Sequence, residues 1–133
     1  MKIEDVEGIG PAYAAKLVKA GVKTTDALLA RGGKPKGRDE LEKATGISHS
    51  KILEWVNHVD LYRIDGIGSE YSDLLEEAGV DTVVELSKRV PANLAAKMDE
   101  INAKKKIVRR VPGETVVKGW IDQAKKLPRI VEY

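Results

Sequence analysis

The stretch VEGIGPAYAAKLVKAGVKTTDALL at residues 6–29 returns in altered form as IDGIGSEYSDLLEEAGVDTVVELS at residues 64–87. A shift of 58 residues aligns the two and places the triplet Gly8-Ile9-Gly10 on Gly66-Ile67-Gly68. The same shift aligns further glycine, tyrosine, threonine and leucine positions. Because self-similarity at a fixed spacing marks repeated structural units, the sequence predicts two copies of one supersecondary unit.

A second match extends the repeat toward the end of the chain. KILEWVNHV at 51–59 resembles VVKGWIDQA at 116–124, with Trp55 opposite Trp120. The shift is now 65 residues, so the second copy carries seven extra residues, which we place near 102–113. The predicted organisation is a first repeat at 1–60, a second repeat at 61–127 and a tail at 128–133.

The hydrophobic pattern predicts helices throughout, since spacings of three and four residues recur and no segment alternates like a strand. In the first repeat we expect helices near 3–7, from Pro11 to Gly21, at 25–31 after Thr24, at 38–45 before Gly46, and after Ser48. The second of these carries Ala14, Leu17 and Val18 on one side, and the last carries Ile52, Trp55, Val56 and Val59 on one face. Residues 32–38 are predicted to form a loop. The second repeat follows the same plan, with a capping box of Thr82 and Glu85, a helix starting at Pro91 and a last helix between Gly113 and Pro128.

Composition excludes several classes of protein. Cysteine is absent, which excludes disulfides, thiolate metal sites and cysteine nucleophiles, and it suits a reducing cytoplasm, where we expect the protein to reside. We find no signal peptide at the start of the sequence and no apolar run approaching the roughly 20 residues of a membrane span. Phe is also absent, so the core is expected to consist of Leu, Ile, Val and Ala.

The glycine triplet has a specific physical meaning between two helices. Two glycines one residue apart allow the chain to reverse with positive φ and close backbone approach, while the Ile between them points inward. The following helix then starts with unpaired amides and the positive end of its dipole, which together favour an anion such as phosphate. A purely structural alternative stays open, in which the glycines only shape the turn and let two helices pack closely.

This pattern resembles the helix-hairpin-helix motif of sequence-nonspecific DNA-binding proteins, over residues 3–29 and 61–87. Across nearly the whole chain, including RDELEKATGIS and the closing KLPRIVEY, the sequence resembles the bacterial domain of unknown function family 4332. Members of that family are taken to be nucleic-acid binders because of the motif. The fold implied is all-α, with two tandem five-helix helix-hairpin-helix (SAM-domain-like) repeats packed as a pseudo-symmetric pair.

The resemblance also implies which groups contact phosphate. They are the backbone amides around Ile9, near Gly8, Gly10 and Ala12, and those near Gly66, Gly68 and Ser69. Some hairpins of this class also hold a monovalent cation on their carbonyls, and no other metal or cofactor is expected.

The two hairpins differ in charge. DNA-binding versions often carry a basic residue two positions after the second glycine, where this chain has Ala12 and Glu70. The first hairpin keeps Lys16 and Lys19, with Glu7 beside it. The second is flanked by five carboxylates: Asp65, Glu70, Asp73, Glu76 and Glu77. Because carboxylates oppose phosphate binding, we expect the second hairpin to be structural or to face a protein partner.

Basic residues gather outside the hairpins as well. Residues 61–95 hold three basic and seven acidic side chains, whereas residues 96–133 hold ten basic and five acidic, although the net charge is only +2. The densest group, here called the basic cluster, comprises Lys104, Lys105, Lys106, Arg109 and Arg110; a second group comprises Arg31, Lys34, Lys36 and Arg38. Either group is suited to follow a phosphate backbone with salt-dependent affinity, and the alternative is an ordinary solvated face.

Catalysis is not expected. The two histidines, His49 and His58, lie nine residues apart without a metal-ligand spacing, and no lysine is marked out as a lyase nucleophile. The leading hypothesis is non-enzymatic, sequence-independent DNA binding through the hairpin amides and the basic cluster. The alternative is a protein–protein interaction or assembly module without DNA binding, in which the acidic second hairpin of one molecule meets the basic C-terminal region of another. Neither a membrane nor a small-molecule substrate is expected as a partner.

Overall fold

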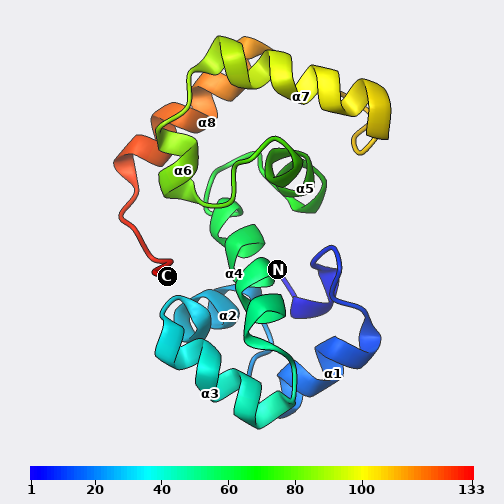
Figure 1. Ribbon diagram of the computed structural model, residues 1–133, viewed down its shortest axis with the longest axis vertical. Helices are drawn as coiled ribbons and strands as arrows, with labels where there is room; N and C mark the ends of the chain where they lie inside the picture. Colours follow the sequence, from blue (N-terminus) through cyan, green and yellow to red (C-terminus); the bar gives the residue numbers. More distant parts are fainter. The chain divides into compact units, whose positions relative to one another are not determined.

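The computed structural model describes residues 1–133 and is helical throughout (Figure 1). A short 3-10 helix η1 (Ile3–Asp5) precedes eight α-helices: α1 (Pro11–Lys19), α2 (Thr25–Gly32), α3 (Pro35–Thr45), α4 (His49–Leu61), α5 (Ser69–Glu77), α6 (Val83–Ser87), α7 (Pro91–Lys105) and α8 (Glu114–Lys126). Strand-like pairing is limited to an isolated bridge between Lys2 and Thr24. The all-helical prediction is therefore confirmed, and none of these helices has both the length and the apolar character that crossing a membrane requires.

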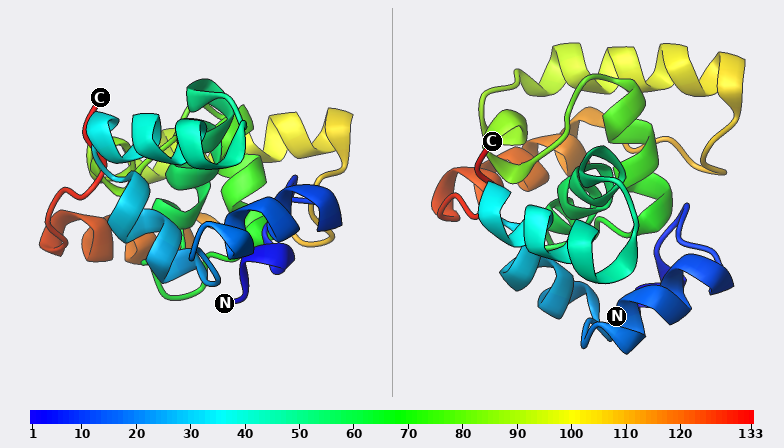
Figure 2. Two further views of the ribbon diagram at one scale, coloured as in Figure 1. Left: turned by 90° about the horizontal axis from the view of Figure 1, so that it is seen from below. Right: turned by 60° about the horizontal axis from the view of Figure 1, so that its bottom comes forward.

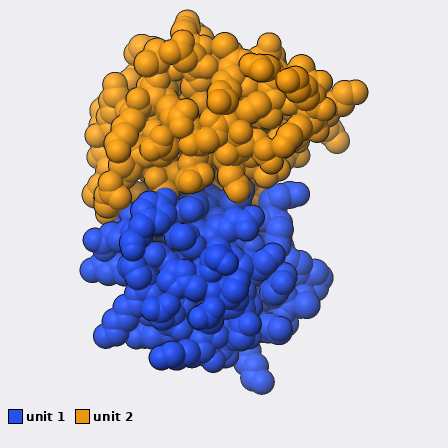
Figure 3. All heavy atoms as spheres, in the orientation of Figure 1, with its two compact units in different colours: residues 1–60, 130–133 blue, residues 61–129 orange.

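The chain forms two compact units (Figure 3). Unit 1 comprises residues 1–60 together with 130–133, and unit 2 comprises residues 61–129. Unit 1 contains five helices when η1 is counted. Unit 2 contains four, because the residues before Gly66 form turns rather than a separate short helix. The expected fifth helix is thus missing from the second unit.

The core of unit 1 is aliphatic, as predicted. Ile52, Trp55, Val56 and Val59 of α4 are all buried, so the face expected of this helix is confirmed. On α1, Ala14 and Leu17 are buried, whereas Val18, predicted on the same side, is 42% exposed. Successive residues of a helix are rotated by about 100°, so Val18 points away from the buried side that Leu17 occupies.

The ends of α1 and the start of α2 follow local sequence signals. Gly21 has φ +91°, and Val22 N donates to Leu17 O at 2.8 Å, which closes the helix in a Schellman motif. Thr24 then caps α2, because its Oγ1 accepts from Ala27 N at 3.1 Å. The left-handed stop at Gly21 and the threonine cap are both confirmed.

The predicted loop at residues 32–38 is wrong over most of its length. Helix α2 continues to Gly32, and α3 begins at Pro35, which leaves only two residues between them. A Cβ on Gly37 would lie 1.7 Å from Arg31 O. The glycine at this position therefore serves the close packing of α3 against α2 and does not indicate a turn.

Arg38 lies inside unit 1, not on the surface as the second basic group assumed. Its side chain is 1% exposed and donates from Nη1 to Gly32 O at 2.8 Å and from Nη2 to Glu132 O at 2.6 Å. Glu132 N in turn donates to Gly33 O at 2.7 Å, so residues 130–133 run beside the start of α3 (Figure 2). Burial lowers the pKa of Arg38 because desolvation disfavours the charged form, while the nearby charge of Asp39 acts in the opposite direction.

Unit 2 is built around α8, which packs on α6 and α7, while α5 packs on α7. Thr82 caps α6 by accepting from Glu85 N at 3.3 Å, but the Glu85 carboxylate bonds Arg89 instead of returning to the cap, so only half of the predicted capping box forms. Helix α7 has 15 residues whereas α3 has 11, and it starts at Pro91 as predicted. The longer α7 and the segment after it carry the basic cluster.

Candidate nucleic-acid interface

The first hairpin, residues 8–10, turns at a single left-handed glycine. Gly8 has φ +87°, and Ile9 points inward with 3% of its surface exposed. Gly10 is extended (φ −79°, ψ 176°) and forms the N-cap of α1, with open space where a Cβ would stand. The expectation of positive φ at both glycines is therefore wrong for the second, because a residue that caps a helix start takes a β-region backbone.

Most amides at this turn have no acceptor within the protein, whereas the amide of Ile9 donates to Val6 O at 3.0 Å. Pro11 occupies the first helical position, and the first amide of the region to bond along the helix is that of Ala14, which donates to Gly10 O at 2.9 Å. The amides of Gly8, Gly10 and Ala12 have no acceptor in the protein, and all three residues are exposed. The start of α1 thus presents a set of accessible backbone donors.

Three lysines lie on the helices that form this hairpin region. Lys16 and Lys19 are exposed on α1. Lys51 of α4 lies over the ring of Tyr13, with Nζ 5.3 Å from the ring centroid. Lys51 was not among the predicted site residues. It precedes Trp55 by one helical turn, and the rings of Trp55 and Tyr13 pack against each other with centroids 5.1 Å apart.

The second hairpin, residues 66–68, has the same backbone but different neighbours. Gly66 has φ +97°, Ile67 is buried, and Gly68 is the extended N-cap of α5. Ser69 is held in place, since its Oγ lies 2.8 Å from Tyr62 Oη and its carbonyl accepts from Ser72 Oγ at 2.9 Å. The side chain of Glu70 adds a negative charge to the first turn of α5, where an anion would otherwise be favoured.

The basic cluster begins in the last turn of α7. Lys106 takes a left-handed conformation (φ 50°), and the side-chain amide of Asn102 bridges to Val108 through two hydrogen bonds of 3.0 and 2.9 Å. Tyr71 Oη donates to Arg110 O at 3.0 Å, which attaches the cluster to α5. The fold therefore brings the basic cluster beside the acidic helix of the second hairpin.

The five cations of the cluster are not equally available. Lys105 Nζ lies 2.6 Å from Glu77 Oε2, and Lys104 Nζ lies 4.0 Å from Glu100 Oε1. Lys106, Arg109 and Arg110 are exposed and their side chains form no ion pair. These three side chains are the strongest candidates for contact with an anionic partner.

A family model described as Domain of unknown function (DUF4332) matches residues 7–127. The chain belongs to the DUF4332 family. No curated protein and no solved structure matches the chain. In this DUF4332 chain the matched range includes both hairpins and the whole basic cluster.

The second basic group of the DUF4332 chain is largely occupied by structural contacts. Arg31 Nη1 donates to Ala20 O at 2.6 Å at the end of α1, Lys34 lies 3.9 Å from Glu132, and Arg38 is buried. Only Lys36 keeps a free side chain at the edge of a surface hollow of about 360 Å³. Arg38 is therefore not available to a phosphate backbone, and Arg31 and Lys34 already contact groups of the protein.

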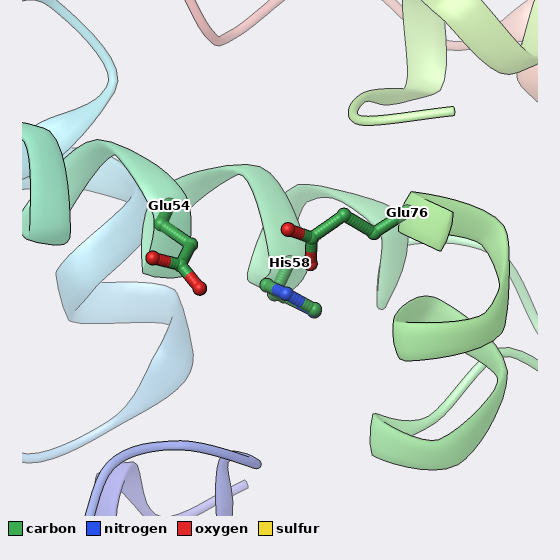
Figure 4. Close-up of side chains that lie close together, drawn as sticks. All are labelled: Glu54, His58 and Glu76. Carbon is green, nitrogen blue, oxygen red and sulfur yellow. The ribbon is translucent and has the colours of Figure 1, made fainter. Parts of the chain in front are cut away.

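Both histidines of the DUF4332 chain lie on α4, and His49 contacts side chains of α3. His49 Nδ1 lies 2.7 Å from Asp39 Oδ1, and its Nε2 accepts from Arg38 Nε at 3.1 Å. Figure 4 shows Glu54 and His58 one turn apart on α4 of unit 1.

Proposed function

We propose that this DUF4332 chain is a non-enzymatic, sequence-independent DNA-binding protein of the reducing cytoplasm. The observation that carries the proposal is the first hairpin, where the exposed residues Gly8, Gly10 and Ala12 have amides without an acceptor in the protein. A helix start of this kind attracts anions through its unpaired N–H groups and its dipole. Backbone donors contact phosphate without reading base edges, which is why we propose binding that is independent of sequence.

The basic cluster is the second part of the proposed surface. Lys106, Arg109 and Arg110 have no ion-pair partners and supply charge that is screened by salt. Lys104 and Lys105 add less, because each already lies near a carboxylate. The second hairpin adds nothing in this proposal, since Glu70 and Glu77 repel phosphate.

We further propose that the two units are duplicated helix-hairpin-helix repeats. Four features support this. In each unit the first glycine of the hairpin has positive φ, and a threonine caps the helix that follows the hairpin helix. In each unit a tyrosine of the hairpin helix also packs against a later tryptophan. Finally, an arginine (Arg31 or Arg89) donates to a carbonyl at the end of the hairpin helix. Features that recur at corresponding places favour duplication over coincidence.

An assembly module is the second candidate function. The ion pair between Lys105 and Glu77 demonstrates that the basic cluster and the acidic helix α5 have complementary charges. The same pairing between two molecules would give self-association that weakens as salt rises.

An electrophoretic shift assay with two unrelated duplexes, run beside light scattering at low and high salt, separates the two functions. DNA binding predicts that both duplexes shift equally and that the shift weakens with salt. If the protein self-associates at low salt, dissociates at high salt and shifts neither duplex, the result would favour assembly and contradict the DNA-binding proposal.

A further inference from the structure

The indole nitrogen of Trp55 is an unpaired donor on an otherwise buried side chain. Trp55 is 2% exposed, and its ring packs against Tyr13. Its Nε1 has no hydrogen-bond acceptor in the protein. Every fully buried side-chain nitrogen or oxygen of the protein has a hydrogen-bond partner. Because Trp55 Nε1 has none, this nitrogen must belong to the small exposed part of the side chain. An indole N–H normally finds a partner when its ring is buried, so a partner from outside the chain is indicated.

The indole nitrogen of Trp55 lies beside the first hairpin. A Cβ built on Gly8 would have Trp55 Nε1 as its nearest neighbour, at 3.8 Å. Gly8 is exposed and its own amide is unpaired. The absence of a side chain at Gly8 therefore leaves the indole N–H uncovered next to the backbone donors of the turn.

We propose that Trp55 Nε1 donates a hydrogen bond to a phosphate oxygen bound at the first hairpin, together with the backbone amides of the turn. This site rests on the proposed function for its natural ligand, a phosphodiester backbone. The ammonium group of Lys51, one turn before Trp55 and over the Tyr13 ring, adds positive charge beside the site. The indole supplies a donor from α4, so that phosphate joins two helices of unit 1 instead of contacting one helix start alone.

The second hairpin supplies a control within the same chain. A Cβ on Gly66 would lie 3.1 Å from Trp120 Nε1, so the second indole takes the corresponding place. The charges around it are more negative, because Glu70 replaces Ala12, Glu77 replaces Lys19, and the neutral Val116 replaces Lys51. The same indole donor is therefore expected to bind phosphate at the first hairpin and not at the second.

The test uses nuclear magnetic resonance of the full-length, nitrogen-15-labelled chain. The protein contains two tryptophans, so two indole N–H signals are expected, and Trp120→Phe assigns them. Inorganic phosphate is added at constant pH, and a parallel titration with chloride at the same ionic strength serves as the control. We expect the Trp55 signal to move and saturate while the Trp120 signal stays. A motionless Trp55 signal, or equal movement of both signals, would overturn the proposal.

A binding measurement gives a second readout. Trp55→Phe keeps an aromatic ring against Tyr13 but removes the donor, and affinity for a labelled duplex is expected to fall about tenfold, the effect of losing one hydrogen bond to a charged group. Trp120→Phe is the matched control and should leave the affinity within about twofold.

The two proposals fail in different ways. A duplex that shifts without moving the Trp55 signal would remove the indole contact and leave the DNA-binding function. A Trp55 signal that responds to inorganic phosphate while no duplex shifts would leave the anion site and remove DNA as its ligand.

Discussion

Lys105 Nζ lies 2.6 Å from Glu77 Oε2, and this ion pair joins the end of α7 to the end of α5 within unit 2. The assembly hypothesis from the sequence pairs the acidic second hairpin of one molecule with the basic C-terminal region of another. Within one molecule, part of the positive charge of the cluster is neutralised by the helix beside it. The ion pair is half exposed, so it has little effect on stability, but it lowers the charge that a partner meets.

Glu77→Gln tests this neutralisation. The substitution frees the Lys105 ammonium, so affinity for a random duplex is expected to rise about twofold to threefold at low salt, with a steeper decrease as salt is added. Fluorescence anisotropy of a labelled duplex measures both effects. Glu40→Gln makes the same charge change on α3 of unit 1. Equal effects of the two variants would contradict a specific role for the ion pair.

Charge reversal at Arg109 and Arg110 tests the basic cluster itself. Both side chains are exposed without ion pairs, so Arg109→Glu with Arg110→Glu should weaken duplex binding by about tenfold or more while the thermal midpoint stays unchanged. The control is Lys43→Glu with Lys36→Glu on α3, which changes the net charge equally. Unchanged affinity in the cluster variant would show that this surface does not bind DNA.

Gly37→Ala is expected to destabilise unit 1, because the new Cβ would lie 1.7 Å from Arg31 O and would force α2 and α3 apart. The expected loss is about 1–3 kcal/mol, the usual cost of overpacking. Gly119→Ala on α8 has open space around it and should stabilise unit 2 by about 0.5–1 kcal/mol, since alanine favours a helix. Denaturant unfolding of the two variants measures the contrast, and a neutral Gly37→Ala would contradict the close packing.

Arg38→Met removes the donors that hold residues 130–133 on unit 1. The carbonyls of Gly32, Gly33 and Glu132 would lose their guanidinium partner, so we expect the Glu132 amide to exchange with solvent at least about tenfold faster. Hydrogen exchange measures this rate directly. Arg38→Lys should restore protection only in part, because a lysine lacks the planar fork of donors. Full protection in Arg38→Met would contradict the role assigned to Arg38.

Local signals in the sequence predicted most of the fold. Gly21, Thr24 and Pro91 act on their own helix ends through geometry that depends on a few neighbouring residues, and the structure has them in those places. The predicted loop at 32–38 is helical from Pro35 onward. The role of Gly37 depends on how closely α3 approaches α2, which no local pattern contains.

The candidate site depends on tertiary contacts, which the spacing of residues in the sequence does not reveal. The turn at Gly8 and the inward side chain of Ile9 follow from the motif. The burial of Arg38 depends on Glu132, 94 residues away, and so a cation that belonged to a predicted surface group is part of the interior. Lys51 and the indole of Trp55 join the first hairpin only through packing against Tyr13 and Gly8.

Ala12→Glu provides the most direct measurement of the central claim, that the amides at the start of α1 bind the DNA backbone. Ala12 is exposed in the first turn, and the change gives the first hairpin the residue that the second has at Glu70. A carboxylate there favours the helix, so the fold should be retained. Anisotropy with a labelled random duplex should show affinity reduced by about tenfold or more, because the new charge repels phosphate. Affinity equal to that of the unmodified chain would contradict the account.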